Sequence, residues 1–221
     1  QAAFQRASKD PTLIYSFYLL TQIPLAARTD DFAKALQDRG LPVSKSPSLF
    51  DLLGAFTHAV DEYAGRNPDV TVFGEMAQFA AVESLTALGR PTTATIFDIS
   101  PDDVQFALRK LSTVKNFGFL ARDFFSRFSR RFLTYYLSRE LSNHVGPDRR
   151  FGNIDEHTEF NRALDLHCRE AARIVEDFAG SWFSKTEFET GIDPEKTRVF
   201  MHVAFRKIKD EMKARGGRNG E

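Results

Sequence analysis

Cysteine is almost absent from this chain, which has one, Cys168, in 221 residues. A single cysteine cannot form an intramolecular disulfide, and it cannot build the cysteine clusters that hold structural zinc. A fold of this length must therefore be stabilised by its own core, which 221 residues are long enough to supply. The low cysteine content suits a reducing compartment, and we expect a cytoplasmic protein.

Long apolar runs are also absent. The most apolar run, residues 12–27, is 16 residues long and includes Ser, Thr, Gln and Pro, whereas a membrane-spanning helix needs about 20 mostly apolar residues. The sequence therefore predicts no membrane span, and no signal-peptide pattern occurs. The chain begins at Gln1 rather than at methionine, so we expect a further N-terminal segment to precede it.

The common catalytic and cofactor motifs are missing. The patterns GxSxG, GxxxxGK[ST], GxGxxG and HExxH do not occur. Their absence argues against an α/β hydrolase, a P-loop NTPase and a dinucleotide-binding enzyme. We expect no cofactor, and the leading prediction is a protein that is not an enzyme.

The chain has no net charge, with 30 basic and 30 acidic residues, but the charges are segregated. Residues 51–103 contain nine acidic residues and two arginines. Residues 115–150 contain eight basic and three acidic residues, and residues 206–218 contain six basic and two acidic ones. The two halves can neutralise each other in the fold or present opposite faces to partners, and the sequence leaves both alternatives open.

Helix signals are dense along the whole chain. Asp10-Pro11 and Ser100-Pro101 each supply an N-cap residue followed by a first-turn proline, and the residues at 191–194 are expected to cap the last helix. The sequence predicts an all-α protein: one domain over 1–221 with seven or eight helices and at most one short extended connector, near 92–99. Within it we distinguish an acidic half, 1–90, a basic half, 100–215, and a flexible tail, 214–221.

Two expected helices have clear apolar faces. In residues 74–89 one face carries Met76, Phe79, Ala80, Val82 and Leu85. A single helix over about 155–182 carries a seam that includes His167. His167 is either a satisfied core histidine or a metal ligand or acid–base group in a dry environment. Cys168 is expected to be a small buried residue.

The Phe-rich stretch 116–141 is the most unusual part of a chain with 22 phenylalanines. On a helix from about 113 to 143, one seam contains Phe117, Leu120, Phe124, Phe128, Phe132 and Tyr135. The opposite side carries Phe119, Leu133 and Leu137, and Arg122, Arg127 and Arg130 lie on the flanks. An interfacial membrane helix would keep one wide polar face, and a nucleic-acid surface would expose its aromatic rings. We therefore predict a core helix that neighbours cover all round.

Two sets of residues are candidate sites. The anion or partner-binding set consists of Arg130, Arg131, Arg139, Arg149, Arg150 and Phe151. These arginines can form a clamp for an oxyanion, or they can pair internally with the acidic helices of residues 51–103. The metal set consists of Glu140, His144, Asp155, His157 and His167.

The sequence supports three functional hypotheses. The first is a non-enzymatic helical interaction or scaffold module, a subunit or adaptor that docks a protein partner. The second is nucleic-acid or phosphate-ligand binding through the basic back half. The third is a metal-dependent hydrolase that uses the histidines and carboxylates of residues 140–170.

Overall fold

The computed structural model describes residues 2–67, 71–89, 100–141 and 154–218, and within these ranges the protein is all-α. The predicted all-α fold class is confirmed, although the described residues form ten helices rather than the predicted seven or eight. The helices are α1 (Ala2–Ala7), α2 (Pro11–Ala26), α3 (Phe32–Gln37), α4 (Leu49–Arg66), α5 (Val72–Leu88), α6 (Pro101–Lys110), α7 (Val114–Leu141), α8 (Ile154–Ala171), α9 (Arg173–Thr190) and α10 (Pro194–Arg218). The predicted connector at 92–99 lies outside the described residues.

Local capping explains where several helices begin. Asp10 caps α2 by accepting a hydrogen bond from the Leu13 N–H, and Pro11 occupies the first turn. Ser48 and Ser100 form capping boxes, with Asp51 at α4 and Asp103 at α6. These starts are properties of short sequence segments, and those predicted at Asp10 and Ser100 are confirmed.

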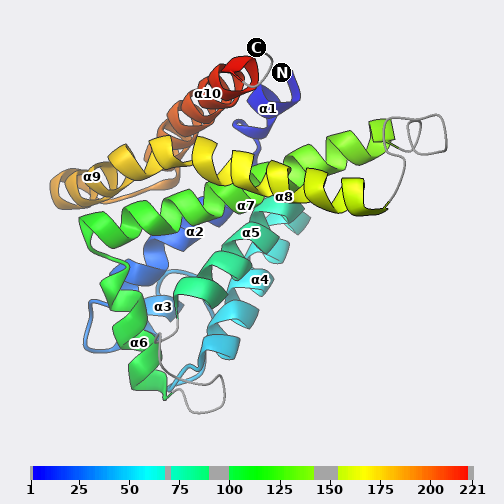
Figure 1. The fold of residues 1–221 in the computed structure, drawn as a ribbon. Helices are drawn as coiled ribbons and strands as arrows, with labels where there is room; N and C mark the ends of the chain where they lie inside the picture. Colours follow the sequence, from blue (N-terminus) through cyan, green and yellow to red (C-terminus); the bar gives the residue numbers. More distant parts are fainter. Residues whose placement is uncertain (1, 68–70, 90–99, 142–153, 219–221) are drawn as a thin grey trace.

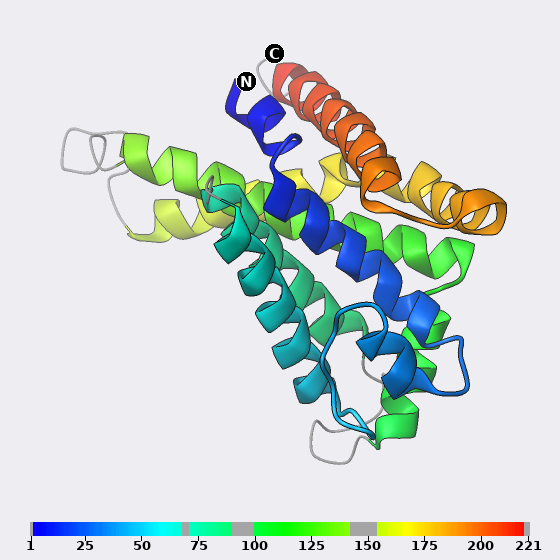
Figure 2. The same cartoon turned by 180° about the vertical axis from the view of Figure 1, so that it is seen from behind.

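Helix α7 lies at the centre of the molecule (Figure 1). Helices α8 and α9 cover one side of it, α5 packs against another, and α2 packs against α5. Figure 2, the view from behind, shows α2 crossing in front of α7, with α10 beside it. The first and last helices, α1 and α10, lie together at one end.

The predicted aromatic seam of α7 is buried from Phe117 to Phe132, and Tyr135 at its end is half-buried. Five rings of this helix have 5% or less of their surface exposed, namely Phe117, Phe124, Phe125, Phe128 and Phe132. Phe117 stacks on Phe183 of α9 with 3.9 Å between ring centroids, and Phe124 packs against Phe17 of α2 at 5.1 Å. The helix is therefore a core element, because its rings fill the space between the surrounding helices.

The prediction that neighbours cover α7 on every side is wrong. Phe119 is 37% exposed, and Arg130 and Thr134 on the same helix are also exposed. Helices α5 and α8 both contact α7, but they leave a strip of its surface open between them. This strip becomes the floor of the groove described below.

The prediction of a single helix over 155–182 is also wrong. The chain turns at Ala172 and forms two helices, α8 and α9. Ala171 and Ala172 are completely buried at this turn. No glycine or proline marks the position in the sequence. The turn instead lets both helices follow the surface of α7, as Figure 1 shows.

The last element of the fold is the basic C-terminal helix. Helix α10 begins at Pro194, after Asp193 accepts a hydrogen bond from the Lys196 N–H, and it continues to Arg218. The predicted cap at 191–194 is therefore confirmed.

Among the described helices, none combines the length and the apolar character needed to cross a bilayer.

Candidate functional site: an arginine-lined groove between α5, α7 and α8

The candidate site is an open groove with a volume of about 620 Å³ between three helices. Helix α5 forms one wall, α7 the floor and α8 the other wall. Its lining residues are Val72, Glu75, Met76, Phe79 and Glu83 from α5, Asp123, Ser126, Arg127, Arg130, Arg131, Thr134 and Tyr135 from α7, and Asp165 and Arg169 from α8. A volume of this size lies within the range of ordinary ligand sites.

Helical spacing places these side chains on facing surfaces. On α5, Val72, Met76, Phe79 and Glu83 follow one another at steps of four, three and four residues. On α7, Asp123, Arg127 and Arg131 are each four residues apart, and Asp165 and Arg169 have the same spacing on α8. Residues three or four apart share one face of a helix, so these rows of α5, α7 and α8 all face the groove.

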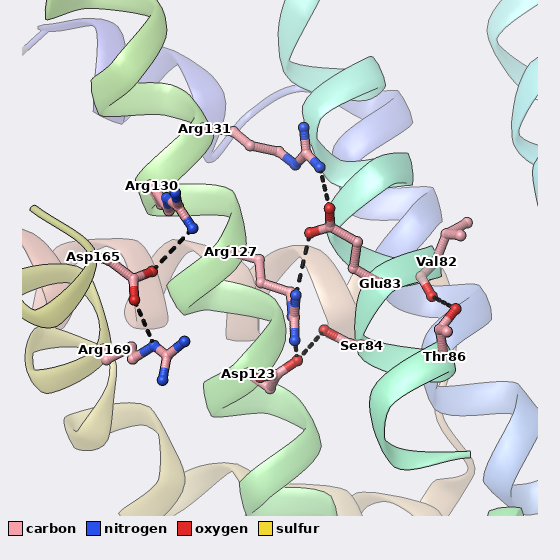
Figure 3. A network of polar contacts seen from close by, with 10 residues as sticks. All are labelled: Val82, Glu83, Ser84, Thr86, Asp123, Arg127, Arg130, Arg131, Asp165 and Arg169. Carbon is pink, nitrogen blue, oxygen red and sulfur yellow. Dashed lines mark hydrogen bonds and ion pairs between the residues drawn. The ribbon is translucent and has the colours of Figure 1, made fainter. Parts of the chain in front are cut away.

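On the α5 side, the arginines of α7 are neutralised. Arg127 contacts Asp123 at 2.6 Å and Glu83 at 3.3 Å, and Arg131 contacts the other oxygen of Glu83 (Figure 3). Asp123 also accepts a hydrogen bond from the Ser84 hydroxyl at 2.7 Å. Two carboxylates thus hold two guanidinium groups, and these contacts tie α5 to α7 (Figure 3).

Arg127 stays charged in this environment. Burial alone would lower the pKa of its guanidinium, but the hydrogen bond and charge of Asp123, and then those of Glu83, outweigh burial and raise it. An arginine of this kind cannot exchange a proton near neutral pH. Its chemistry in the groove is that of a fixed cation and hydrogen-bond donor.

On the α8 side, two arginines share one carboxylate. Asp165 lies 3.3 Å from Arg130 of α7 and 3.0 Å from Arg169 of α8, and the two guanidinium groups approach it from opposite directions (Figure 3). The side chains of Arg130 and Arg169 are 53% and 64% exposed. Because each guanidinium has five N–H donors, this end of the groove keeps donors directed to solvent and a local excess of positive charge.

An exposed aromatic ring lies beside these charges. Phe79 of α5 is 47% exposed, and the guanidinium of Arg131 lies 5.1 Å from the centre of its ring. Phe79 belongs to the predicted apolar face of α5, and Val82 on the same face is only half-buried. The apolar face of α5 is wider than its neighbours cover, so it continues into the groove wall next to Met76.

The structure resolves part of the predicted anion or partner-binding set. Arg130 and Arg131 both line the groove. The predicted internal pairing with the acidic helices of residues 51–103 is observed for Arg131, which binds Glu83, whereas Arg130 pairs with Asp165 of α8. The side chain of Arg139, together with Arg149, Arg150 and Phe151, lies outside the described residues.

Arg127, Phe79 and Arg169 are among the groove residues that the sequence does not predict as site residues. Helical spacing places Arg127 on the flank of a core helix and Phe79 on an apolar face. The sequence signal at Arg169 is its four-residue spacing from Asp165, which is typical of an ion pair on a helix. Only the packing of α5 and α8 on α7 brings these residues together.

The predicted metal set is only partly described. The side chains of Glu140, His144, Asp155 and His157 lie outside the described residues. Within the described part of the chain, no group of three or more histidine, cysteine, aspartate and glutamate side chains is placed to hold a metal ion. His167 is half-buried on α8, where burial and then the charge of Arg215 lower the pKa of its imidazole.

Cys168 is completely buried beside the groove wall. Burial, with a further effect of the Asp165 charge, raises the pKa of its thiol to about 12. A thiol in this state is protonated at neutral pH and is a poor nucleophile. Cys168 is thus the small buried residue that the sequence predicts.

Comparisons with protein-family models, with curated proteins and with solved structures find no match to this chain. The chemistry of the groove itself is therefore what bears on its function.

Proposed function

We propose that this chain is a non-enzymatic interaction module that docks a protein partner in the groove between α5, α7 and α8. The observation that supports this most directly is the pair Arg130 and Arg169, which share Asp165 and keep exposed donors close to the exposed ring of Phe79. Arginine and aromatic side chains are the residue types that contribute most to protein interfaces.

The polar chemistry of the groove favours binding over proton transfer. Among its described carboxylates, Glu83, Asp123 and Asp165 are each held by arginine. A general acid or base needs a pKa near the working pH, and arginine does not provide one. The groove residues therefore serve better as fixed charges that orient a ligand.

The charge balance favours a protein partner over nucleic acid. The four arginines of the groove are accompanied by four carboxylates, on Glu75, Glu83, Asp123 and Asp165. Nucleic-acid binding depends on neutralising several phosphates in a row, and these carboxylates would repel such a row. A protein segment can instead place one acidic side chain near Arg130 and Arg169 and apolar side chains on α5.

A photo-crosslinking experiment tests this proposal. A benzophenone amino acid is introduced at Thr134, on the groove floor, or at Phe188, which is 92% exposed on α9 and does not line the groove. Both full-length variants are produced and irradiated in the cells that naturally make the protein. We expect a defined crosslinked protein from position 134 that is absent from position 188.

The double variant Arg130→Glu, Arg169→Glu provides the specificity control. If the groove docks the partner through charge, this variant loses the crosslink at 134 by at least about tenfold, as for loss of a hot-spot pair. The same crosslinks at 134 and 188, or a crosslink at 134 that survives the charge reversal, would overturn the proposal.

A further inference from the structure

We infer that the groove accepts an amphipathic helix of the partner, with one carboxylate directed at the Arg130–Asp165–Arg169 cluster and an apolar side chain on Phe79. This inference rests on the proposed function and specifies the chemistry of the partner. Its evidence is the length of the groove, the helical nature of its walls and the unequal charge of its two sides.

The groove has room for a short helix along α7. Its α7 residues run from Asp123 to Tyr135, which corresponds to about 18 Å at 1.5 Å per residue. That length equals about three helical turns. Its floor includes Ser126, Arg130 and Thr134, which lie four residues apart in one row of α7 and become exposed toward its C-terminal end.

The walls favour a helix over an extended peptide. An extended segment must pair its backbone N–H and C=O groups with another strand or with water. All three elements that line the groove are helices, whose main-chain groups are already bonded internally, so they offer no strand edge. A helical ligand satisfies its own backbone and presents only side chains to the groove.

The charge distribution sets the orientation of the ligand. On the α5 side, Arg127 and Arg131 are balanced by Asp123 and Glu83, and Glu75 adds a negative charge to that wall. On the α8 side, Arg130 and Arg169 share only Asp165 among the described residues. A carboxylate of the ligand is therefore attracted toward α8 and repelled from α5.

The apolar residues of the α5 wall receive the other flank of the ligand. Val72, Met76 and Phe79 follow the helical spacing of four and three residues along this wall. An apolar row on the ligand with the same spacing can pack along them, which is the usual way in which a helix binds a groove. The expected ligand thus carries an apolar row beside a carboxylate, on neighbouring flanks of one helix.

Peptide selection tests the inference directly. A display library of random 16-residue peptides is selected on the immobilised full-length protein, and selected peptides are measured by fluorescence anisotropy. We expect enrichment of peptides with apolar residues at three- and four-residue spacing and an acidic residue on the adjoining flank. A proline in the middle of such a peptide should weaken binding at least about tenfold, because it breaks the helix.

Variants of the protein locate the contacts. The double variant Arg130→Gln, Arg169→Gln should weaken the selected peptides about tenfold or more, and Phe79→Ala should weaken them by a similar factor. Arg198→Gln is the matched control, because Arg198 on α10 is 54% exposed and also forms an ion pair, with Glu195. This control should leave affinity unchanged.

Each alternative outcome is distinguishable. If the selected peptides tolerate proline or lack an acidic residue, the inference of a helical ligand with a carboxylate is overturned, while the proposal that the groove docks a protein is unaffected. Binding that is unaffected by the groove variants, or no enrichment at all, overturns the inference, and the crosslinking at position 134 then decides separately whether the groove docks any protein. Displacement of the peptides by millimolar inorganic phosphate or citrate, with equal dependence on Arg130 and Arg169, would instead assign the site to small anions.

Discussion

At the scale of single residues, the buried carboxylate of Asp10 joins two helices. It accepts a hydrogen bond from the Leu13 N–H at 2.7 Å and another from the Thr71 hydroxyl, which precedes α5. Burial raises the pKa of Asp10 above its ordinary value of 3.8, although the bonds from Thr71 and the backbone act in the opposite direction. The folded state therefore disfavours the charged form of this side chain.

A comparison of the variant Asp10→Asn with the wild type at different pH values tests whether the folded state disfavours the charged form of Asp10. Because the folded pKa is raised, the stabilisation from Asp10 is complete below pH 3.8 and is lost as the pH rises through the folded pKa. Asn has no charge and keeps an oxygen for the Leu13 N–H. We expect the free energy of unfolding of the wild type, relative to the variant, to decrease between about pH 3.5 and pH 7 in urea titrations.

Asp103 provides a control with the opposite sign. The hydroxyl and backbone of Ser100 lower the pKa of Asp103, so its stabilisation is present above pH 3.8 and is lost on acidification. Relative to Asp103→Asn, the wild type should therefore become less stable as the pH falls. Equal pH dependence for the two variants would contradict the assigned environments.

At the scale of elements, α7 and α9 approach each other closely at two glycines. A Cβ atom at Gly180 of α9 would lie 1.9 Å from the carbonyl oxygen of Val114, and one at Gly118 of α7 would lie 2.9 Å from the carbonyl oxygen of Glu176. Both obstacles are backbone atoms, which cannot move without shifting a helix. The glycines permit the stacking of Phe117 on Phe183 between the same two helices.

The variant Gly180→Ala should separate these helices. We expect it to lower the free energy of unfolding by about 1–3 kcal/mol, the usual cost of overpacking, despite the better helix propensity of alanine. Gly118→Ala should have a smaller effect because its contact is longer. Chemical denaturation of each variant gives the values.

Gly54 is the matched control within a helix. It lies in α4, and a Cβ atom there would meet nothing within 4 Å. Gly54→Ala should therefore stabilise the protein by about 0.5–1 kcal/mol through helix propensity alone. A stabilising effect of Gly180→Ala of the same size would show that the α7–α9 approach is looser than described.

At the scale of the whole molecule, Glu170 links four helices. From α8 it lies 3.8 Å from Arg122 of α7, 3.4 Å from Arg173 of α9 and 3.9 Å from Arg215 of α10. Its side chain is 29% exposed, so solvent screens these contacts only partly. One carboxylate thus helps to hold the three C-terminal helices around the central one.

The variant Glu170→Gln should lower the free energy of unfolding by about 1–2 kcal/mol, because it leaves three arginines without this charge. The difference in the free energy of unfolding between this variant and the wild type should shrink in 1 M salt, because the Debye length there is only about 3 Å. Glu189→Gln is the control, because Glu189 forms one exposed pair with Lys185, and its effect should stay below about 0.5 kcal/mol. Equal effects of the two variants would contradict a linking role for Glu170.

The sequence alone determined the fold class, several helix starts and the core helix. These features depend on neighbouring residues: Asp10 and Ser100 cap their own helices, and the rings from Phe117 to Phe132 share a face through helical spacing. The same spacing also predicted the arginines on the flanks of α7. Such local patterns are visible before any helix has packed.

Only the tertiary structure decided the turn at Ala172, the exposure of Phe79 and the groove. Periodicity shows that a helix has an apolar face, but it does not show how much of that face a neighbour covers or where a helix must turn to stay in contact with one. Arg130 and Arg169 meet at Asp165 because α7 and α8 pack side by side. That contact joins residues more than 30 positions apart, and local spacing carries no information about such a distance.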